Sequence, residues 1–131
     1  MRIRSVIFIF LLSLTFLGWN IIHNNAKNKD NKNIVVLVKY KTQPSKEKDA
    51  INSLTELINK VKKEPHFVKI KLHVDSKDKT NILLYEEWDD ETYYNSSHMI
   101  TDHLQKFIGD SRNFLMGPPE ISFWNVEKEF K

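Results

Sequence analysis

The chain is 131 residues long, which suits one domain with a short extension. It contains no cysteine, so disulfides, thiolate metal sites and a catalytic cysteine are excluded. The net charge of +3 comes from the first 33 residues, which hold five basic side chains and one acidic one, whereas residues 34–131 hold 15 and 16. The folded part therefore lacks a basic nucleic-acid footprint, and no nucleic acid is expected as a partner.

The N-terminus has the pattern of an export signal. Arg2 and Arg4 precede an apolar run over residues 5–22, which as a helix would be about 27 Å long, enough to span a bilayer core. No clear small-residue cleavage site follows, so a cleaved signal peptide and an uncleaved anchor that holds the chain in a membrane both stay open. We expect this hydrophobic helix at residues 1–23, followed by a polar linker at residues 24–33.

This segment predicts a domain that is exported to the periplasm or the extracellular space, or anchored on the outer side of a membrane. The sequence says little about the orientation of this segment in a membrane, because the lysines of the linker nearly balance the basic residues that precede the apolar run. A reporter fused after Asn33 should be found outside the cytoplasm. Deletion of residues 1–22 should keep it inside, and an unchanged location would contradict the signal.

Residues 34–131 begin with an alternation of strand and helix patterns. Residues 34–40 are a compact, β-branched apolar run, which predicts a strand. Residues 46–64 repeat apolar side chains every three or four positions, which predicts a helix with one apolar stripe, ended by Pro65. Residues 67–74 alternate between apolar and polar side chains, with Val68 on the apolar face, as in a half-buried strand.

The second half continues with a strand over residues 82–88 and a helical segment. Asp89-Asp90-Glu91 offers an N-cap and negative charge for a helix start. We expect the helix over about residues 91–114, and any interruption should fall near Ser96–Ser97 or Gly109.

The last strand is predicted at residues 121–126. The resulting order β-α-β-β-α-β is that of the ferredoxin-like α+β fold, with helices on one face of an antiparallel sheet. Nothing in the chain covers the other face, and a domain of about 98 residues buries only around 60–65% of its surface alone. A homodimer across a two-fold axis is therefore expected.

Four short motifs stand out between residues 34 and 126. They are Glu64-Pro65-His66-Phe67, Tyr85-Glu86-Glu87-Trp88, His98-x4-His103 followed by Phe107, and Gly117-Pro118-Pro119. In this order they resemble the antibiotic biosynthesis monooxygenase (ABM) family, which includes small quinol monooxygenases. The resemblance implies a dimeric α+β barrel that oxidises a small hydroquinone-like or phenolic substrate with O₂ and without a cofactor.

The sequence departs from this family at two places. Many members carry Gly-Cys where this chain has His66-Phe67. Members that degrade haem carry a tryptophan near the position of Ser97 and a haem-ligating histidine about ten residues later, and this chain has neither. A haem-binding member is therefore the less favoured alternative. A second alternative is a non-catalytic dimeric module that binds a small apolar ligand in the same cavity.

Oxygenation without a cofactor needs a proton acceptor inside a dry, aromatic-lined cavity. His98 is the candidate, because imidazole titrates near neutral pH and aromatic residues precede it in the sequence. The competing interpretation is a packed histidine at a helix start, bonded to a backbone carbonyl. His103 follows five residues later, about 140° round a helix, so both histidines can face one site only if the helix breaks between them.

The resemblance places Trp88 and Tyr94 in the pocket wall, although ordinary core packing of these aromatic residues is an equal alternative. The predicted substrate pocket comprises Trp88, Tyr94, Tyr93, Glu86, His103 and Phe107. Glu86 and Glu87 are neighbours on a strand, so one of them should point inward. Phosphate-binding glycine loops and zinc-binding motifs are absent from the sequence, and we expect no cofactor and no metal. The expected partners are a second copy of the chain and a small aromatic or quinol-type ligand.

Overall fold

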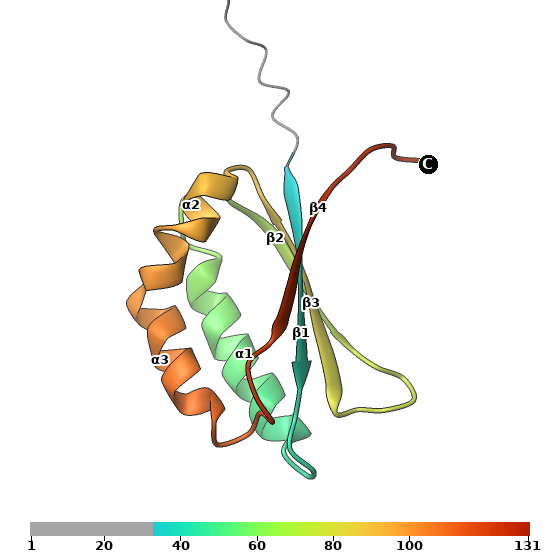
Figure 1. Cartoon of the computed structure of the whole chain (residues 1–131), viewed down its shortest axis with the longest axis vertical. Coiled ribbons are helices and arrows are strands. Elements are labelled where there is room, and N and C mark those ends of the chain that lie inside the picture. Colours follow the sequence, from blue (N-terminus) through green and yellow to red (C-terminus); the bar gives the residue numbers. More distant parts are fainter. Residues whose placement is uncertain (1–32) are drawn as a thin grey trace, which may run out of the picture.

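The computed structural model describes residues 33–131 (Figure 1). The predicted signal or anchor at residues 1–23 lies outside the described residues, as does the predicted linker except for Asn33. Within residues 33–131, no helix combines the length and the apolar character needed to cross a membrane.

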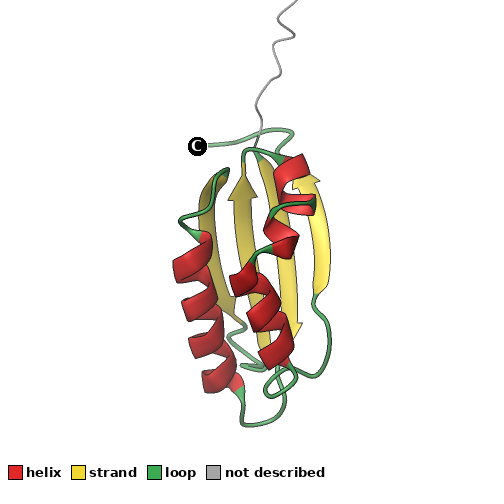
Figure 2. Cartoon of the chain, turned by 90° about the vertical axis from the view of Figure 1, so that its left-hand side faces the viewer, coloured by secondary structure: helices red, strands yellow, loops and turns green. Residues whose placement is uncertain are grey.

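The described chain forms one antiparallel sheet with its helices packed on one face (Figures 1 and 2). This is the ferredoxin-like α+β fold predicted from the sequence. The elements in chain order are β1 (Ile34–Lys41), α1 (Glu47–Val61), β2 (Phe67–Val74), β3 (Asn81–Trp88), α2 (Glu91–Asn95), the 3₁₀ helix η1 (His98–Ile100), α3 (Asp102–Ser111) and β4 (Glu120–Asn125).

The strand order in the sheet is β2-β3-β1-β4, so β1 lies in the interior and pairs with both β3 and β4. This position explains its run of β-branched residues, because Val35, Val36 and Val38 are all buried. β2 and β4 are the edge strands. The face of the sheet away from the helices is free of other elements of the described chain, as the side view shows (Figure 1).

The strict alternation predicted for β2 fails at its start. The register with β3 shifts between Phe67 and Lys69, which is a β-bulge. Val68 is the extra residue, and its side chain is 40% exposed instead of sharing the buried face with Ile70. The bulge follows directly on the turn that carries Glu64 and thus changes the direction of the chain beside that residue.

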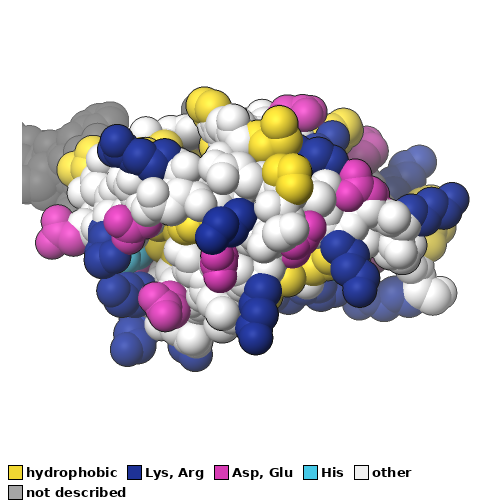
Figure 3. All heavy atoms as spheres, turned by 90° about the horizontal axis from the view of Figure 1, so that it is seen from below, with side chains coloured by type: hydrophobic (Ala, Val, Ile, Leu, Met, Phe, Trp, Pro, Cys, Tyr) yellow, Lys and Arg dark blue, Asp and Glu magenta, His cyan; other side chains and the backbone are white. Residues whose placement is uncertain are grey.

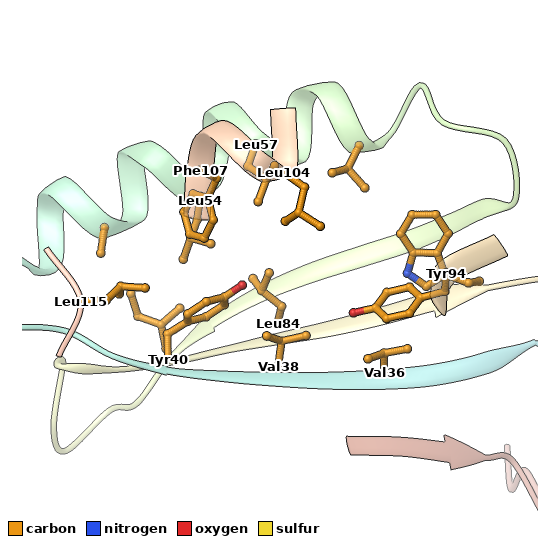
Figure 4. Packing of buried hydrophobic residues seen from close by; sticks show 14 of the residues in the cluster. Val36, Val38, Tyr40, Leu54, Leu57, Leu84, Tyr94, Leu104, Phe107 and Leu115 are labelled. Atoms are coloured by element: carbon orange, nitrogen blue, oxygen red, sulfur yellow. The ribbon is translucent and has the colours of Figure 1, made fainter. Parts of the chain in front are cut away.

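The core lies between the sheet and the helices (Figure 4). The inward stripe of α1 consists of Ala50, Leu54, Leu57 and Val61, all of which are buried. Each fully buried large side chain of this kind stabilises the fold by roughly 1.5–3 kcal/mol. Trp88, at the end of β3, is fully buried. Tyr94 and His98, which follow β3 in the chain, pack against Trp88 at one end of this core.

The helical segment expected over residues 91–114 is divided into α2, η1 and α3. Asp90 caps α2, since its side chain accepts a hydrogen bond from the Tyr93 backbone N–H at 2.8 Å. Ser96 then leaves the helical conformation, with φ −119° and ψ −82°, and Thr101 is extended, with φ −64° and ψ 143°. The chain therefore changes direction twice between Tyr94 and His103.

Charged side chains of both signs are interspersed on the end of the molecule seen in Figure 3. Exposed ion pairs of the described residues include Lys41 with Asp78 and Lys106 with Asp110. Each contributes about 0–1 kcal/mol because both partners stay in water. This mixture agrees with the near-neutral net charge of residues 34–131, and neither acidic nor basic side chains occupy the face shown alone.

Candidate functional site

A cavity of about 690 Å³ lies between the sheet and the helices. Most of its wall is apolar and comes from β1, β3, α1, α3 and the segment that leads into β4. Leu57 of α1 and Leu104 of α3 contribute to the helical side, and Val38 and Leu84 contribute to the sheet side (Figure 4). A cavity of this size and character suits a small, mainly apolar ligand.

Four buried polar side chains interrupt the apolar wall, namely Tyr40, Glu86, Tyr94 and His98. The side chains of Tyr40 and Tyr94 point toward one another along the cavity (Figure 4). Burial, reinforced by the charge of Glu86, raises the pKa of both tyrosines well above the usual range. Both hydroxyls therefore stay protonated and can donate a hydrogen bond to an oxygen atom of a ligand.

Glu86 brings a carboxyl group into the same wall. Burial raises the pKa of Glu86 to about 7, although the hydrogen bond that Trp88 Nε1 donates to its Oε2 at 3.0 Å acts in the opposite direction. The nearby charge of Glu64 adds to the increase. Near neutral pH this carboxyl is therefore partly protonated and can donate or accept a hydrogen bond.

Glu64, in the turn between α1 and β2, is the centre of a buried hydrogen-bond cluster. Its Oε2 lies 2.9 Å from Nδ1 of His98 and accepts a hydrogen bond from the Tyr93 hydroxyl at 3.1 Å. Its Oε1 pairs with Nε2 of His103. The side chain of Glu64 is only 6% exposed. A carboxylate buried to this extent needs such partners, because an unpaired one is costly.

The ring of His98 faces Glu64 with its Nδ1 atom. Nδ1 lies 2.9 Å from Oε2 of Glu64, and a carboxylate accepts hydrogen bonds but does not donate them. The ring is fixed between Trp88 and Tyr94, whose centroids are 4.7 and 4.9 Å from its own. The side chain of His98 is thus held in one orientation in the wall of the cavity.

The break between α2 and α3 brings both histidines to one carboxylate, which a continuous helix would not allow. His98 lies on η1 and His103 lies in the first turn of α3. Among residues 33–131, no group of three potential metal-ligating side chains is arranged to hold a metal ion.

The residues predicted for the site fall into two groups. His98, Tyr94, Glu86 and Phe107 line the cavity. Trp88, Tyr93 and His103 lie behind this wall and support it: Trp88 packs on the ring of His98, and the other two bind Glu64.

Sequence reasoning missed the roles of Tyr40 and Glu64. Tyr40 occupies an ordinary core position of a strand. Glu64 is the last residue of the helix predicted from the sequence, just before Pro65, where a glutamate is usually exposed to solvent. The one available signal was the position of Glu64 at the start of a motif that also contains Pro65 and His66.

The Glu64 cluster and most of the cavity wall lie within a segment that has relatives in other proteins. The antibiotic biosynthesis monooxygenase family model matches residues 33–110, which include Glu64, His98 and His103. The chain belongs to this family. The match ends before β4, which is an edge strand of the same sheet. No curated protein matches the chain in sequence.

Several solved structures have a similar fold. A conserved protein from Methanosarcina mazei Go1 is 22% identical, with a TM-score of 0.65 over 71% of this chain and 91% of that one. A protein from Pseudomonas aeruginosa is 18% identical, with a TM-score of 0.65 over 72% and 93%. A crystal structure named as an antibiotic biosynthesis monooxygenase is 21% identical, with a TM-score of 0.63 over 70% and 95%. At these identities the likeness concerns the fold alone.

Proposed function

We propose that this ABM protein is a cofactor-independent monooxygenase that oxidises a small hydroquinone-like or phenolic compound with O₂. The observation that carries the proposal is an oriented base, His98, in the wall of a largely apolar cavity of about 690 Å³. A hydroquinone matches this cavity, because its ring is apolar and its hydroxyl has a proton to lose. Membership of the family supports the same reaction class.

In the proposed reaction, Nε2 of His98 accepts the proton of a substrate hydroxyl, and the Glu64 carboxylate stabilises the imidazolium that forms. The substrate anion then passes an electron to O₂, and the two radicals combine to form a carbon–oxygen bond. The peroxide anion takes this proton back from Nε2 of His98, and loss of water from the resulting hydroperoxide leaves a carbonyl group. The substrate supplies all four electrons that O₂ takes up, so one oxygen atom stays in the product, the other leaves as water, and no other reductant is needed.

The remaining polar groups of the cavity fit the oxygen atoms in this scheme. Tyr40 and Tyr94 are protonated donors that can hydrogen bond to a substrate oxygen. Most of the cavity wall is apolar, so the substrate anion is less well solvated there than in solution and more reactive toward O₂. Tyr40 and Tyr94 thus bind the substrate, and His98 transfers the proton.

The test is O₂ uptake by the purified protein with a panel of hydroquinones and phenols. We expect uptake with a hydroxylated quinone as product, and His98→Ala should lower turnover by roughly 10²–10⁴-fold, the scale of a lost general base. His73→Ala is the matched control, because His73 is an exposed histidine of β2 outside the cavity wall.

A folded His98→Ala variant with the wild-type rate would contradict the role of His98 as the base. Tight binding of a hydroquinone without any O₂ uptake would contradict the enzyme and favour the non-catalytic ligand-binding module.

A further inference from the structure

The Glu64 carboxylate has a role that no sequence motif assigned to it. We infer that Glu64 is a positioning residue, which fixes the proton of His98 on Nδ1 and thereby keeps Nε2 bare toward the cavity. The catalytic consequence rests on the function proposed above. The placement of the proton does not, and it can be measured without turnover.

The first support is the contact between Glu64 and His98. Neutral imidazole carries its proton on either nitrogen, and the hydrogen bond made by one nitrogen decides the state of the other. Here Oε2 of Glu64 lies 2.9 Å from Nδ1 of His98, and both side chains are only 6% exposed. Water cannot readily replace the carboxylate at this depth, so the preference for the Nδ1–H form is strong.

The second support is the way in which Glu64 itself is held. Oε1 is paired with His103 from α3, and Oε2 also accepts from the Tyr93 hydroxyl of α2. His103 and Tyr93 thus hold the carboxylate in place from two helical segments, α3 and α2. His103 and Tyr93 do not line the cavity, so their contacts serve Glu64 and not a ligand.

The third support is that other ionisable groups around His98 do not replace Glu64. Tyr94 stacks on the ring of His98 and stays protonated. Tyr93 and His103 form their hydrogen bonds with Glu64 and not with His98. Glu86 of β3 lines the same cavity, but its Oε2 accepts from Trp88. Glu86 therefore offers a matched control, because it is a buried carboxyl in the same wall whose hydrogen bond comes from Trp88 and not from His98.

The experiment measures the ring nitrogens of His98 by NMR in the full-length protein with ¹⁵N-labelled histidine, at a pH where the ring is neutral. His98→Gln identifies the signals. The wild-type protein should show a protonated Nδ1 and a bare Nε2. Glu64→Gln keeps the size of the side chain, but its amide can donate as well as accept, so the ring should become a mixture of the two forms. Glu86→Gln should leave the Nδ1–H form as it is.

Kinetics supply the second readout. If the proposed function holds, Glu64→Gln should lower kcat by about 10–100-fold, the usual scale for a residue that orients another, with little change in KM. A purely structural role would lower the amount of folded enzyme and leave the tautomer of the folded fraction unchanged.

The outcomes separate the two proposals. A proton on Nε2 in the wild-type protein overturns the positioning role even if Glu64→Gln does not fold. An unchanged tautomer in folded Glu64→Gln also overturns it, whether or not the enzyme turns over. A tautomer that changes as expected in a protein that consumes no O₂ supports the positioning role and refutes the monooxygenase.

Discussion

Glu86 places an acidic group where water cannot solvate it, and stability should depend on pH as a result. Its pKa rises from the ordinary 4.5 to about 7 in the folded protein, chiefly because of burial. Between these two values the folded chain binds more protons than the unfolded chain, so stability falls as pH rises through this window. Above pH 7 the full cost is on the order of 3 kcal/mol.

We therefore expect Glu86→Gln to raise the free energy of unfolding at pH 8 and to flatten its decline between pH 5 and pH 8. The amide oxygen can still accept the hydrogen bond from Trp88. Urea unfolding at both pH values measures the effect. Glu87→Gln is the control, because bonds from Lys69 and Tyr85 help to lower the pKa of Glu87, so removing this carboxylate should not stabilise the protein. An equal slope for wild type and Glu86→Gln would refute the prediction.

At this scale the sequence identifies residue types better than roles. The inward direction of one of two adjacent glutamates follows from strand alternation, and His98 stands out because aromatic residues precede it. The Glu64 cluster could not be predicted in the same way, since it depends on where a turn after α1 meets the divided helix. Local spacing carries no information about such a distant contact.

The turn between α1 and β2 holds a residue in a conformation that side chains disfavour. His66 has a φ of 67°, in the left-handed region, and its Nδ1 lies 2.6 Å from Oδ1 of Asp89. Its ring also packs against Tyr93, with centroids 4.9 Å apart. These contacts offset the backbone strain, which for a residue with a Cβ atom is about 1–2 kcal/mol. The same turn presents Glu64 to its partners.

Two substitutions separate the backbone strain from the side-chain contacts. His66→Gly and His66→Ala both remove the ring, but only glycine adopts a positive φ without strain. We expect His66→Gly to be more stable than His66→Ala by about 1 kcal/mol. Guanidinium unfolding of the two variants measures the difference. The midpoints are compared on the condition that the unfolding free energy depends equally steeply on denaturant concentration in both variants. Identical midpoints would mean that the turn relaxes to another conformation once the ring is gone.

Among the elements, the predicted strands agree closely with the structure, and the largest difference is the helix over residues 91–114. Its break at Ser96 falls where an interruption was expected, but the last part, α3, ends at Ser111. Asp90 gave a sound signal for the start of the predicted helix, since caps act locally. The second start, at Asp102, follows an extended Thr101 whose side chain makes no cap hydrogen bond to the helix. Two sets of tertiary contacts stabilise this break. The aromatic residues pack against Trp88, and both histidines bind Glu64.

For the whole molecule, the homodimer expected from the sequence stays a prediction. The strand register places Leu37 opposite Tyr85 of β3 and Ser122 of β4, on the sheet face away from the helices. Trp124 of β4 is opposite Val35 on the same face and is 57% exposed. The large apolar side chains of Leu37, Tyr85 and Trp124 on this face are suited to contact with a second copy of the chain across a two-fold axis.

Sedimentation of a chain that starts at residue 27 should therefore give about twice the monomer mass at micromolar concentration. Leu37→Glu should reduce it to the monomer mass, because the interface would bury an unpaired charge. Ile100→Glu is the control, since Ile100 is 76% exposed and lies on η1, on the helical side of the sheet. A monomeric wild-type protein would refute the prediction.

The position of Glu64 in the chain also has a consequence for folding. It binds partners that follow it by 29, 34 and 39 residues. During synthesis, a nascent chain that ends at β3 contains the carboxylate but neither histidine of the cluster. Contacts over such separations form only after the intervening loop has closed, which makes them slow compared with helix formation. Partly folded states therefore lack the contact that orients His98. The site is complete only after the helical segment with both histidines has packed against the turn that carries Glu64.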